Sequence, residues 1–195
     1  KVYKYHMKIL AIQNRMGIGD TVIFLPFIKA LSKKFNTPLS LLVKKNSKAD
    51  QFLYNTSYID KILFLERDEK VGDRHNGFLG SLNLIKDLKK HKFEKIIIFN
   101  SSLRFNLIAR FSGIREIYQY PLFKKKRQHI TDTPKIFIKN NFQLDVNDDP
   151  EIQIDDESIS KSITKFAINK TEMNILLGIG GSGNTKRIPA NTFLE

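Results

Sequence analysis

Asp20 is the acidic side chain of this sequence whose surroundings best suit proton transfer. It ends a glycine-containing turn, residues 14–20, that follows a short apolar run beginning at Met7. Glycine backbones bend tightly and allow a ligand to approach closely, and a carboxylate beside such a ligand can accept a proton from a hydroxyl. Aspartate is also a common N-cap of helices, so the sequence alone leaves both roles of Asp20 open.

A second glycine-rich loop occupies residues 178–187 and ends in Thr185, Lys186 and Arg187. Its spacing G-x-G-x-x-G is that of dinucleotide sites, but Pro189 places the expected helix start several residues later than that pattern requires. Backbone donors, one hydroxyl and two cations before a helix N-terminus suit a pyrophosphate. A solvated basic loop accounts for the composition equally well.

The remaining candidate sites are weaker. Residues 124–127 form the one tight block of positive charge, which can bind anionic groups or can be a solvated loop. His6, His75 and His91 do not have the spacing of metal ligands, and we expect them at the surface. The sequence contains no cysteine, which excludes disulfides, zinc-thiolate sites and thiol catalysis. We therefore expect no metal site.

The elements that must position these residues alternate along the chain. Apolar runs predict strands over 7–13, 39–43, 61–65, 95–99 and 116–120, and helical spacing predicts helices between them and over 132–142 and 158–169. Such alternation predicts a Rossmann-like, doubly wound parallel α/β sheet. Ligands bind such sheets at the carboxyl ends of the strands, where the turn at 14–20 lies.

The domain organisation predicted from the sequence is one complete domain and the beginning of another. We assign residues 7–165 to an N-terminal Rossmann-like domain and residues 172–195 to the start of a second domain, with a strand over 174–179. The chain stops soon after the helix start at Pro189, and Met7 looks like a natural start. We therefore expect a fragment of a longer protein, truncated at the C-terminus.

The net charge of +13 over 195 residues suggests an anionic partner, such as a nucleic acid, a membrane surface or a phosphorylated substrate. The excess is mostly lysine, accompanied by many Ile, Asn and Phe, which an AT-rich coding sequence also produces. Neither an aromatic RNA-binding motif nor an arginine-rich helix is visible. The longest apolar stretch, residues 21–28, is far shorter than the ~20 residues of a membrane span, and we expect a cytoplasmic protein.

Taken together, the two glycine-rich loops resemble those of glycosyltransferase family 9, the ADP-heptose:lipopolysaccharide heptosyltransferases. The resemblance begins with Met7 and the following apolar residues and continues through Gly17, Gly19, Asp20 and Pro26. Residues 185–189 resemble the family's Lys-Arg-Trp-Pro motif, with Ile188 in place of Trp. Further matching positions are residues 55–60, Arg104 and residues 109–113. The resemblance covers nearly the whole chain.

This resemblance implies the first half of a two-domain GT-B glycosyltransferase that transfers heptose from ADP-heptose, with inversion, to the lipopolysaccharide core. Asp20 would be the catalytic base. The donor diphosphate would be held by Thr185, Lys186, Gly181 and Ser182, and the acceptor by Gly17, Gly19, Lys124, Lys125 and Arg127. The partners would be a nucleotide sugar as co-substrate and an anionic lipid-linked saccharide acceptor at the inner membrane face, with no tightly bound cofactor and no nucleic acid.

Two other classes of function stay open. A nucleotide-dependent Rossmann oxidoreductase would use the loop at 178–183 and would need an acidic residue after a later strand. A non-enzymatic basic module would bind an anionic polymer or a membrane, with a steep loss of binding at high salt and no dependence on Asp20.

Overall fold

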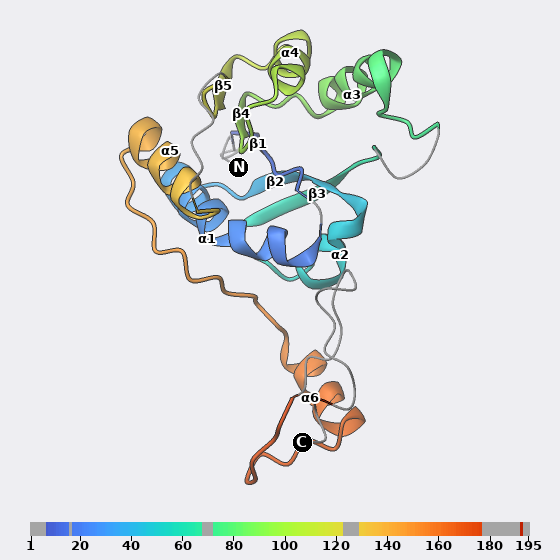
Figure 1. Ribbon diagram of the computed structural model, residues 1–195, viewed down its shortest axis with the longest axis vertical. Coiled ribbons are helices and arrows are strands. Elements are labelled where there is room, and N and C mark those ends of the chain that lie inside the picture. The colour runs from blue at the N-terminus through green and yellow to red at the C-terminus, as the bar shows by residue number, and fades with distance from the viewer. Residues whose placement is uncertain (1–6, 16, 68–71, 123–128, 177–191, 193–195) are drawn as a thin grey trace, which may run out of the picture. The chain divides into compact units, whose positions relative to one another are not determined.

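The computed structural model describes residues 7–15, 17–67, 72–122, 129–176 and 192 (Figure 1). The chain divides into two compact units, Lys1–Gln153 and Ile154–Glu195, and each is described here by itself. The boundary between the two domains that the sequence predicts, at residues 165–172, stays a prediction.

The first unit is built on a sheet of five parallel strands in the order β3-β2-β1-β4-β5. The strands are β1 (Ile9–Ile12), β2 (Leu39–Lys44), β3 (Ile59–Leu65), β4 (Lys95–Ile98) and β5 (Glu116–Gln119). Helices follow the strands: α1 (Ile18–Phe35), η1 (Lys45–Ser47), α2 (Ala49–Phe52), α3 (Gly77–His91), α4 (Leu103–Phe111) and α5 (Asp132–Phe142). The predicted Rossmann-like α/β fold is confirmed, and the strand order reverses between β1 and β4.

The central strands consist almost wholly of buried residues. Every residue of β1 is buried, and so is every residue of its neighbours β2 and β4. Because helices cover both faces of a parallel sheet, strands of this kind need apolar side chains on both sides. Side chains alternate between the two faces: Ile9 and Ala11 belong to one apolar core, and Leu10 and Ile12 to the other.

The first core lies between the sheet and helices α1, α2 and α5, and it is rich in aromatic rings. Phe99, just beyond β4, packs edge-to-face against Phe24 of α1 at 5.2 Å between ring centroids and against Phe137 of α5 at 5.9 Å. Phe142 of α5 contacts Phe35 of α1 in the same manner at 5.7 Å. These contacts attach α5 to α1.

The second core lies between the opposite face of the sheet and helices α3 and α4. Leu84 and Leu88 of α3 and Phe105 and Ile108 of α4 point inward and are buried. α3 and α4 also contact each other, so that together they form the layer on this face.

In the second unit, the described part contains one helix, α6 (Asp156–Lys165). Its N-cap is Asp155, whose Oδ1 accepts a hydrogen bond from the Ser158 backbone N–H at 2.8 Å. Residues 174–176 have no regular structure, so the predicted strand is wrong for these three positions; its other residues lie outside the described part. Among the residues that the structure describes, no helix is long and apolar enough to span a bilayer.

Candidate functional site at the carboxyl edge of the sheet

The turn between β1 and α1 depends on Gly17, which is the N-cap of α1. Its φ of 104° lies in the region that side chains rarely adopt. The Thr21 hydroxyl donates a hydrogen bond to the Gly17 carbonyl at 3.3 Å. Asp20 therefore stands in the first turn of the helix, and its interpretation as the N-cap is wrong. Gly19 has no atom within 4 Å of the place where a Cβ would stand.

The Asp20 carboxylate is accessible, with 29% of its side chain exposed. It forms an ion pair with Arg15, with 3.5 Å between Nη1 and Oδ1. Gln13, buried at the end of β1, fixes both residues: its Nε2 donates to the Asp20 carbonyl at 3.0 Å, and its Oε1 accepts from the Arg15 backbone N–H at 3.1 Å.

The loop after β4 meets this turn because β1 and β4 are neighbours in the sheet. Asn100 Nδ2 donates to Asn14 Oδ1 at 3.1 Å, and Asn100 Oδ1 accepts from the Ser102 backbone N–H at 2.9 Å. Gln119, at the end of β5, donates through Nε2 to the Ser102 carbonyl at 2.8 Å. The carboxyl ends of β1, β4 and β5 are thus joined by amide side chains.

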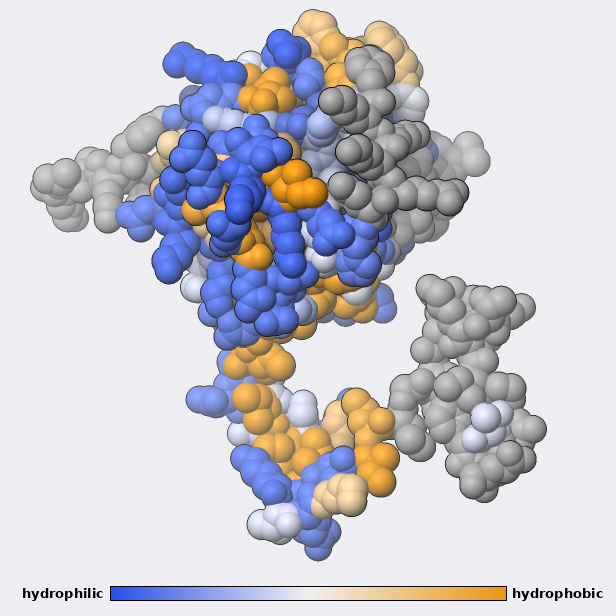
Figure 2. All heavy atoms as spheres, turned by 60° about the vertical axis from the view of Figure 1, so that its left-hand side comes forward, coloured by the Kyte–Doolittle hydropathy of each residue, from blue (hydrophilic) through white to orange (hydrophobic). Residues whose placement is uncertain are grey.

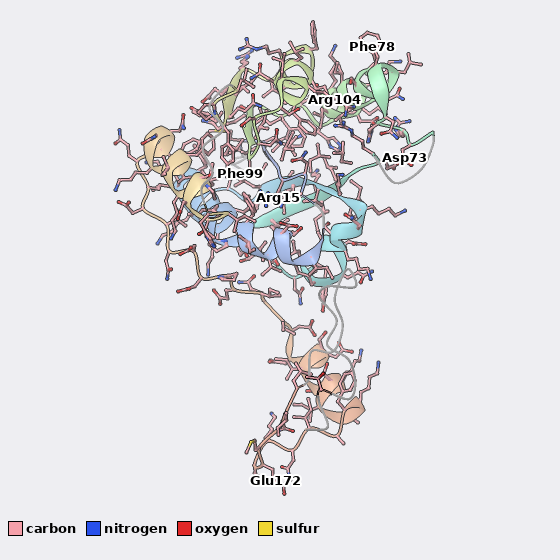
Figure 3. The ribbon with its side chains drawn as sticks, viewed as in Figure 1. Arg15, Asp73, Phe78, Phe99, Arg104 and Glu172 are labelled. Atoms are coloured by element: carbon pink, nitrogen blue, oxygen red, sulfur yellow. The ribbon has the colours of Figure 1, made fainter. Side chains whose placement is uncertain are left out.

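Tyr120 is a residue of this edge that the sequence interpretation missed. Its hydroxyl is buried and, within the part of the chain that the structure describes, has no hydrogen-bond partner. Burial raises the pKa of Tyr120, while the charge of Arg15 acts in the opposite direction. Its ring packs against Phe137 at 5.0 Å and against Phe99 at 6.1 Å. A tyrosine at the carboxyl end of a predicted strand is the signal that points to this position. Arg15 and Phe99 are labelled in Figure 3.

The structure brings together Gly17, Gly19 and Asp20, three of the residues predicted from the sequence, in the first turn of α1. Several others lie outside the described residues, so their placement stays a prediction. These are Lys124, Lys125 and Arg127 of the predicted acceptor site and Gly181, Ser182, Thr185 and Lys186 of the predicted donor site.

His75 is a correction to the sequence analysis, because it is buried rather than at the surface. Its Nδ1 accepts from the Glu66 backbone N–H at 3.0 Å, and its Nε2 lies 3.2 Å from Asp87 Oδ2. The Arg74 guanidinium donates to both carboxylate oxygens of Asp87, at 2.8 to 3.0 Å. These contacts tie the loop that precedes α3 to the helix itself. His91, predicted at the surface, is half-buried against Phe93.

Arg104, one of the positions that carried the resemblance, connects α4 to α3. Its Nε donates to Ser81 Oγ at 2.8 Å, and Nη2 donates to the His75 carbonyl. Within the described ranges, no group of three or more His, Asp or Glu side chains has the geometry to hold a metal ion.

Comparisons with known proteins extend this description. Searches against family models and against curated proteins found no match. Among solved structures, the chain is similar to the glycosyl transferase family 9 protein from Veillonella parvula, with a TM-score of 0.73 and 18% identity. This match covers 96% of the present chain and 58% of that one. The chain is also similar to the E. coli ADP-heptose lipopolysaccharide heptosyltransferase II, with a TM-score of 0.55 and 16% identity. That match covers 84% of the present chain and 52% of the heptosyltransferase.

The similarity of fold to these two structures agrees with the resemblance of the sequence to glycosyltransferase family 9. The chain spans little more than half of either matched structure.

Proposed function

We propose that this chain forms the acceptor-binding half of an inverting glycosyltransferase, which transfers heptose from ADP-heptose to a lipid-linked saccharide. The observation that carries the proposal is the accessible carboxylate of Asp20, which is not an N-cap, at the carboxyl edge of the sheet. The fold likeness to two glycosyltransferases supports the class of reaction, and the motif resemblance supports the sugar and the acceptor.

In the proposed reaction, Asp20 accepts the proton of the acceptor hydroxyl. The acceptor oxygen then forms a bond to the anomeric carbon of the donor, and the bond from that carbon to the diphosphate breaks on the opposite side. The configuration at the carbon is thereby inverted. The open space above Gly19 allows an acceptor to approach the first turn of α1, and Gln13 holds Asp20 in place through its backbone.

The donor half of the proposal rests on Thr185 and Lys186, with the backbone of Gly181 and Ser182. Cations and backbone N–H groups placed there would neutralise the charge that develops on the departing diphosphate. This arrangement needs no tightly bound metal or other cofactor.

The proposed place of action is the cytoplasmic face of the membrane, with the protein bound at its surface. The net charge of +13 supports an anionic acceptor because opposite charge raises the local concentration of the substrate. Lys124, Lys125 and Arg127 are the proposed acceptor contacts.

The test is a transfer assay on the complete gene product with a panel of nucleotide sugars that includes ADP-heptose and a deep-core lipopolysaccharide acceptor. We expect ADP-heptose to give a product one heptose heavier, with the anomeric configuration opposite to that of the donor. Transfer of another sugar would change the proposed donor and leave the proposed reaction class unchanged. No transfer from any donor, or retention of configuration, would contradict the proposal.

A further inference from the structure

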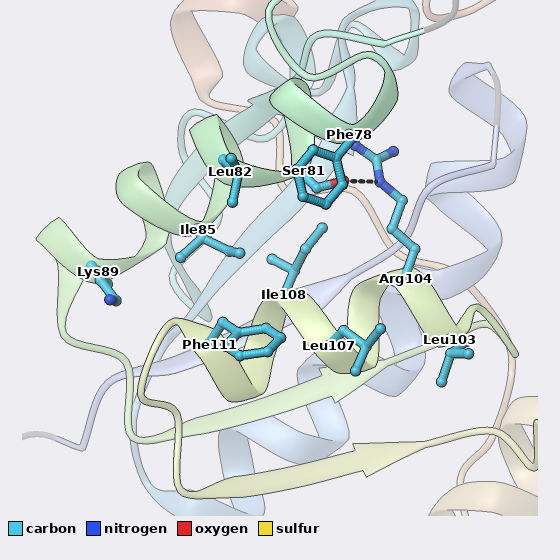
Figure 4. Close-up of a pocket in the computed structure, with 10 residues that line it drawn as sticks. All are labelled: Phe78, Ser81, Leu82, Ile85, Lys89, Leu103, Arg104, Leu107, Ile108 and Phe111. Carbon is cyan, nitrogen blue, oxygen red and sulfur yellow. Dashed lines mark hydrogen bonds between the residues drawn. The ribbon is translucent and has the colours of Figure 1, made fainter.

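An apolar groove runs between α3 and α4 on the outer side of the layer that they form (Figure 4). Its volume is about 690 Å³. Large apolar side chains from both helices line it: Phe78, Leu82 and Ile85 from α3, and Leu103, Leu107 and Phe111 from α4.

The groove residues are strongly exposed for side chains of this size. Phe78 is 78% exposed, Phe111 65% and Leu103 56%. In Figure 2, apolar side chains interrupt the hydrophilic surface at the top of the view, the height at which Figure 1 shows α3 and α4. A contiguous apolar patch of this kind on a protein surface marks a place where another apolar surface docks.

The charges around the groove indicate what docks there. The charged side chains that line the groove are Lys89 of α3 and Arg104 of α4, and the neighbouring Lys86 is exposed. The single acidic residue of α3 is Asp87, whose carboxylate contacts Arg74, His75 and Lys90 and does not line the groove. α4 has no acidic residue. Among the described residues, both charged side chains that line the groove are therefore positive.

A positive rim around an apolar groove fits an anionic lipid membrane better than a second copy of this chain. Two copies joined through this groove would bring the lysines of both α3 helices together, and like charges at an interface are unfavourable. A membrane surface offers hydrocarbon to the phenylalanines and leucines and anionic headgroups to the lysines.

We propose that the α3–α4 groove docks the protein onto an anionic lipid membrane, with Phe78 and Phe111 inserted among the lipids. Both helices begin at the carboxyl edge of the sheet, where Asp20 also lies, so docking in this way would bring that edge close to the lipid. This inference rests on the membrane location given under the proposed function and adds the surface that makes the contact. Its test measures lipid binding, so its failure is distinguishable from a failure of sugar transfer.

The test is co-sedimentation of the complete gene product with vesicles of phosphatidylglycerol and phosphatidylethanolamine, and with vesicles of phosphatidylcholine alone. We expect binding to the anionic vesicles that weakens as salt is added. The double variant Phe78→Ser/Phe111→Ser should bind at least about tenfold more weakly, because two inserted rings are lost. The control is Ile136→Ser, an exposed apolar residue of α5 (47%) on the other layer, which should bind normally.

Each other outcome overturns the proposal. Equal binding by the double variant and the unmodified protein would mean that the groove does not insert. If the double variant and Ile136→Ser lose the same amount of vesicle binding, exposed apolar residues promote binding wherever they lie on the surface. If the unmodified protein is a dimer and the double variant is a monomer, the groove binds a second copy of the chain. If the unmodified protein does not bind vesicles, the groove is covered by something other than lipid. Circular dichroism of both variants establishes that they fold.

Discussion

The two faces of this sheet are covered by helices in different ways. On the face of α1 and α5, aromatic rings pack against one another and are almost entirely buried: Phe27 is 0% exposed, Phe24 4% and Phe137 5%. On the face of α3 and α4, the inner side chains are buried as well, but the outer side of the helix pair displays Phe78 and Phe111 to solvent.

The difference follows from where each helix places its apolar residues. α5 is not a crossover between strands of this sheet, yet Phe137 and Phe142 anchor it over the first core. α3 has apolar residues on two sides, one toward the sheet at Leu84 and Leu88 and one toward the groove at Phe78 and Leu82. Burial in the core explains the first set, and the proposed docking at the groove would account for the second.

Phe99→Ala should cost about 3–5 kcal/mol of unfolding free energy, because it leaves a cavity where three rings meet. Phe78→Ala, the matched truncation on the groove, should change the stability by no more than about 0.5 kcal/mol, since that ring is exposed. Urea unfolding of both variants measures the two changes in unfolding free energy. Similar losses in the two would mean that the groove residues belong to a core.

Gly80→Ala should destabilise the protein by about 1–3 kcal/mol. A Cβ at Gly80 would lie 2.1 Å from the carbonyl carbon of His75, so α3 and the loop before it would have to separate. The matched control is Gly19→Ala in α1, where a Cβ would meet nothing within 4 Å. That change should be neutral or stabilising by up to about 1 kcal/mol. Equal unfolding midpoints for the two variants would refute the close packing at His75.

The acid limb of the stability curve should depend on Asp87. Hydrogen bonds from Arg74, in the main, lower the pKa of Asp87 to about 2. Because this pKa lies below the value in the unfolded chain, the stabilisation is complete above about pH 4 and is lost as the pH falls toward 2.

Asp87→Asn should therefore cost up to about 2 kcal/mol at pH 7 and much less at pH 2.5. Asp145→Asn, an exposed acid at 82%, should cost little at either pH. Urea titrations at the two pH values measure the difference. An Asp87→Asn cost that is the same at both would show that its charge is not involved.

Most of the sheet could be predicted from the sequence, because the runs in β1, β2 and β4 are apolar on both faces and admit no other element of that length. The turn at Gly17 was equally predictable, since a glycine between a strand and a helix has few other uses. Periodicity extended α6 to residue 169, whereas the structure ends it at Lys165. The reason is local, because no buried side chain of α6 holds its last turn in place.

The side chains that complete the edge could not be predicted, because their roles depend on contacts between distant segments. Asn14 meets Asn100 across 86 positions of the chain. The buried His75 contacts the backbone of Glu66 and the side chain of Asp87, and no local sequence pattern indicates these contacts. Tyr120 gave only the weak signal of its place at the end of a predicted strand.

The most direct test of the account is the rate of sugar transfer by the complete gene product carrying Asp20→Asn. The substitution keeps the shape of the side chain and removes its capacity to accept a proton. We predict that kcat falls by about 10²–10⁴-fold, while the affinity for the nucleotide-sugar donor is unchanged and Asp145→Asn transfers at the normal rate. A kcat within about twofold of the unmodified enzyme would contradict the assignment of Asp20 as the base, and with it the proposed mechanism.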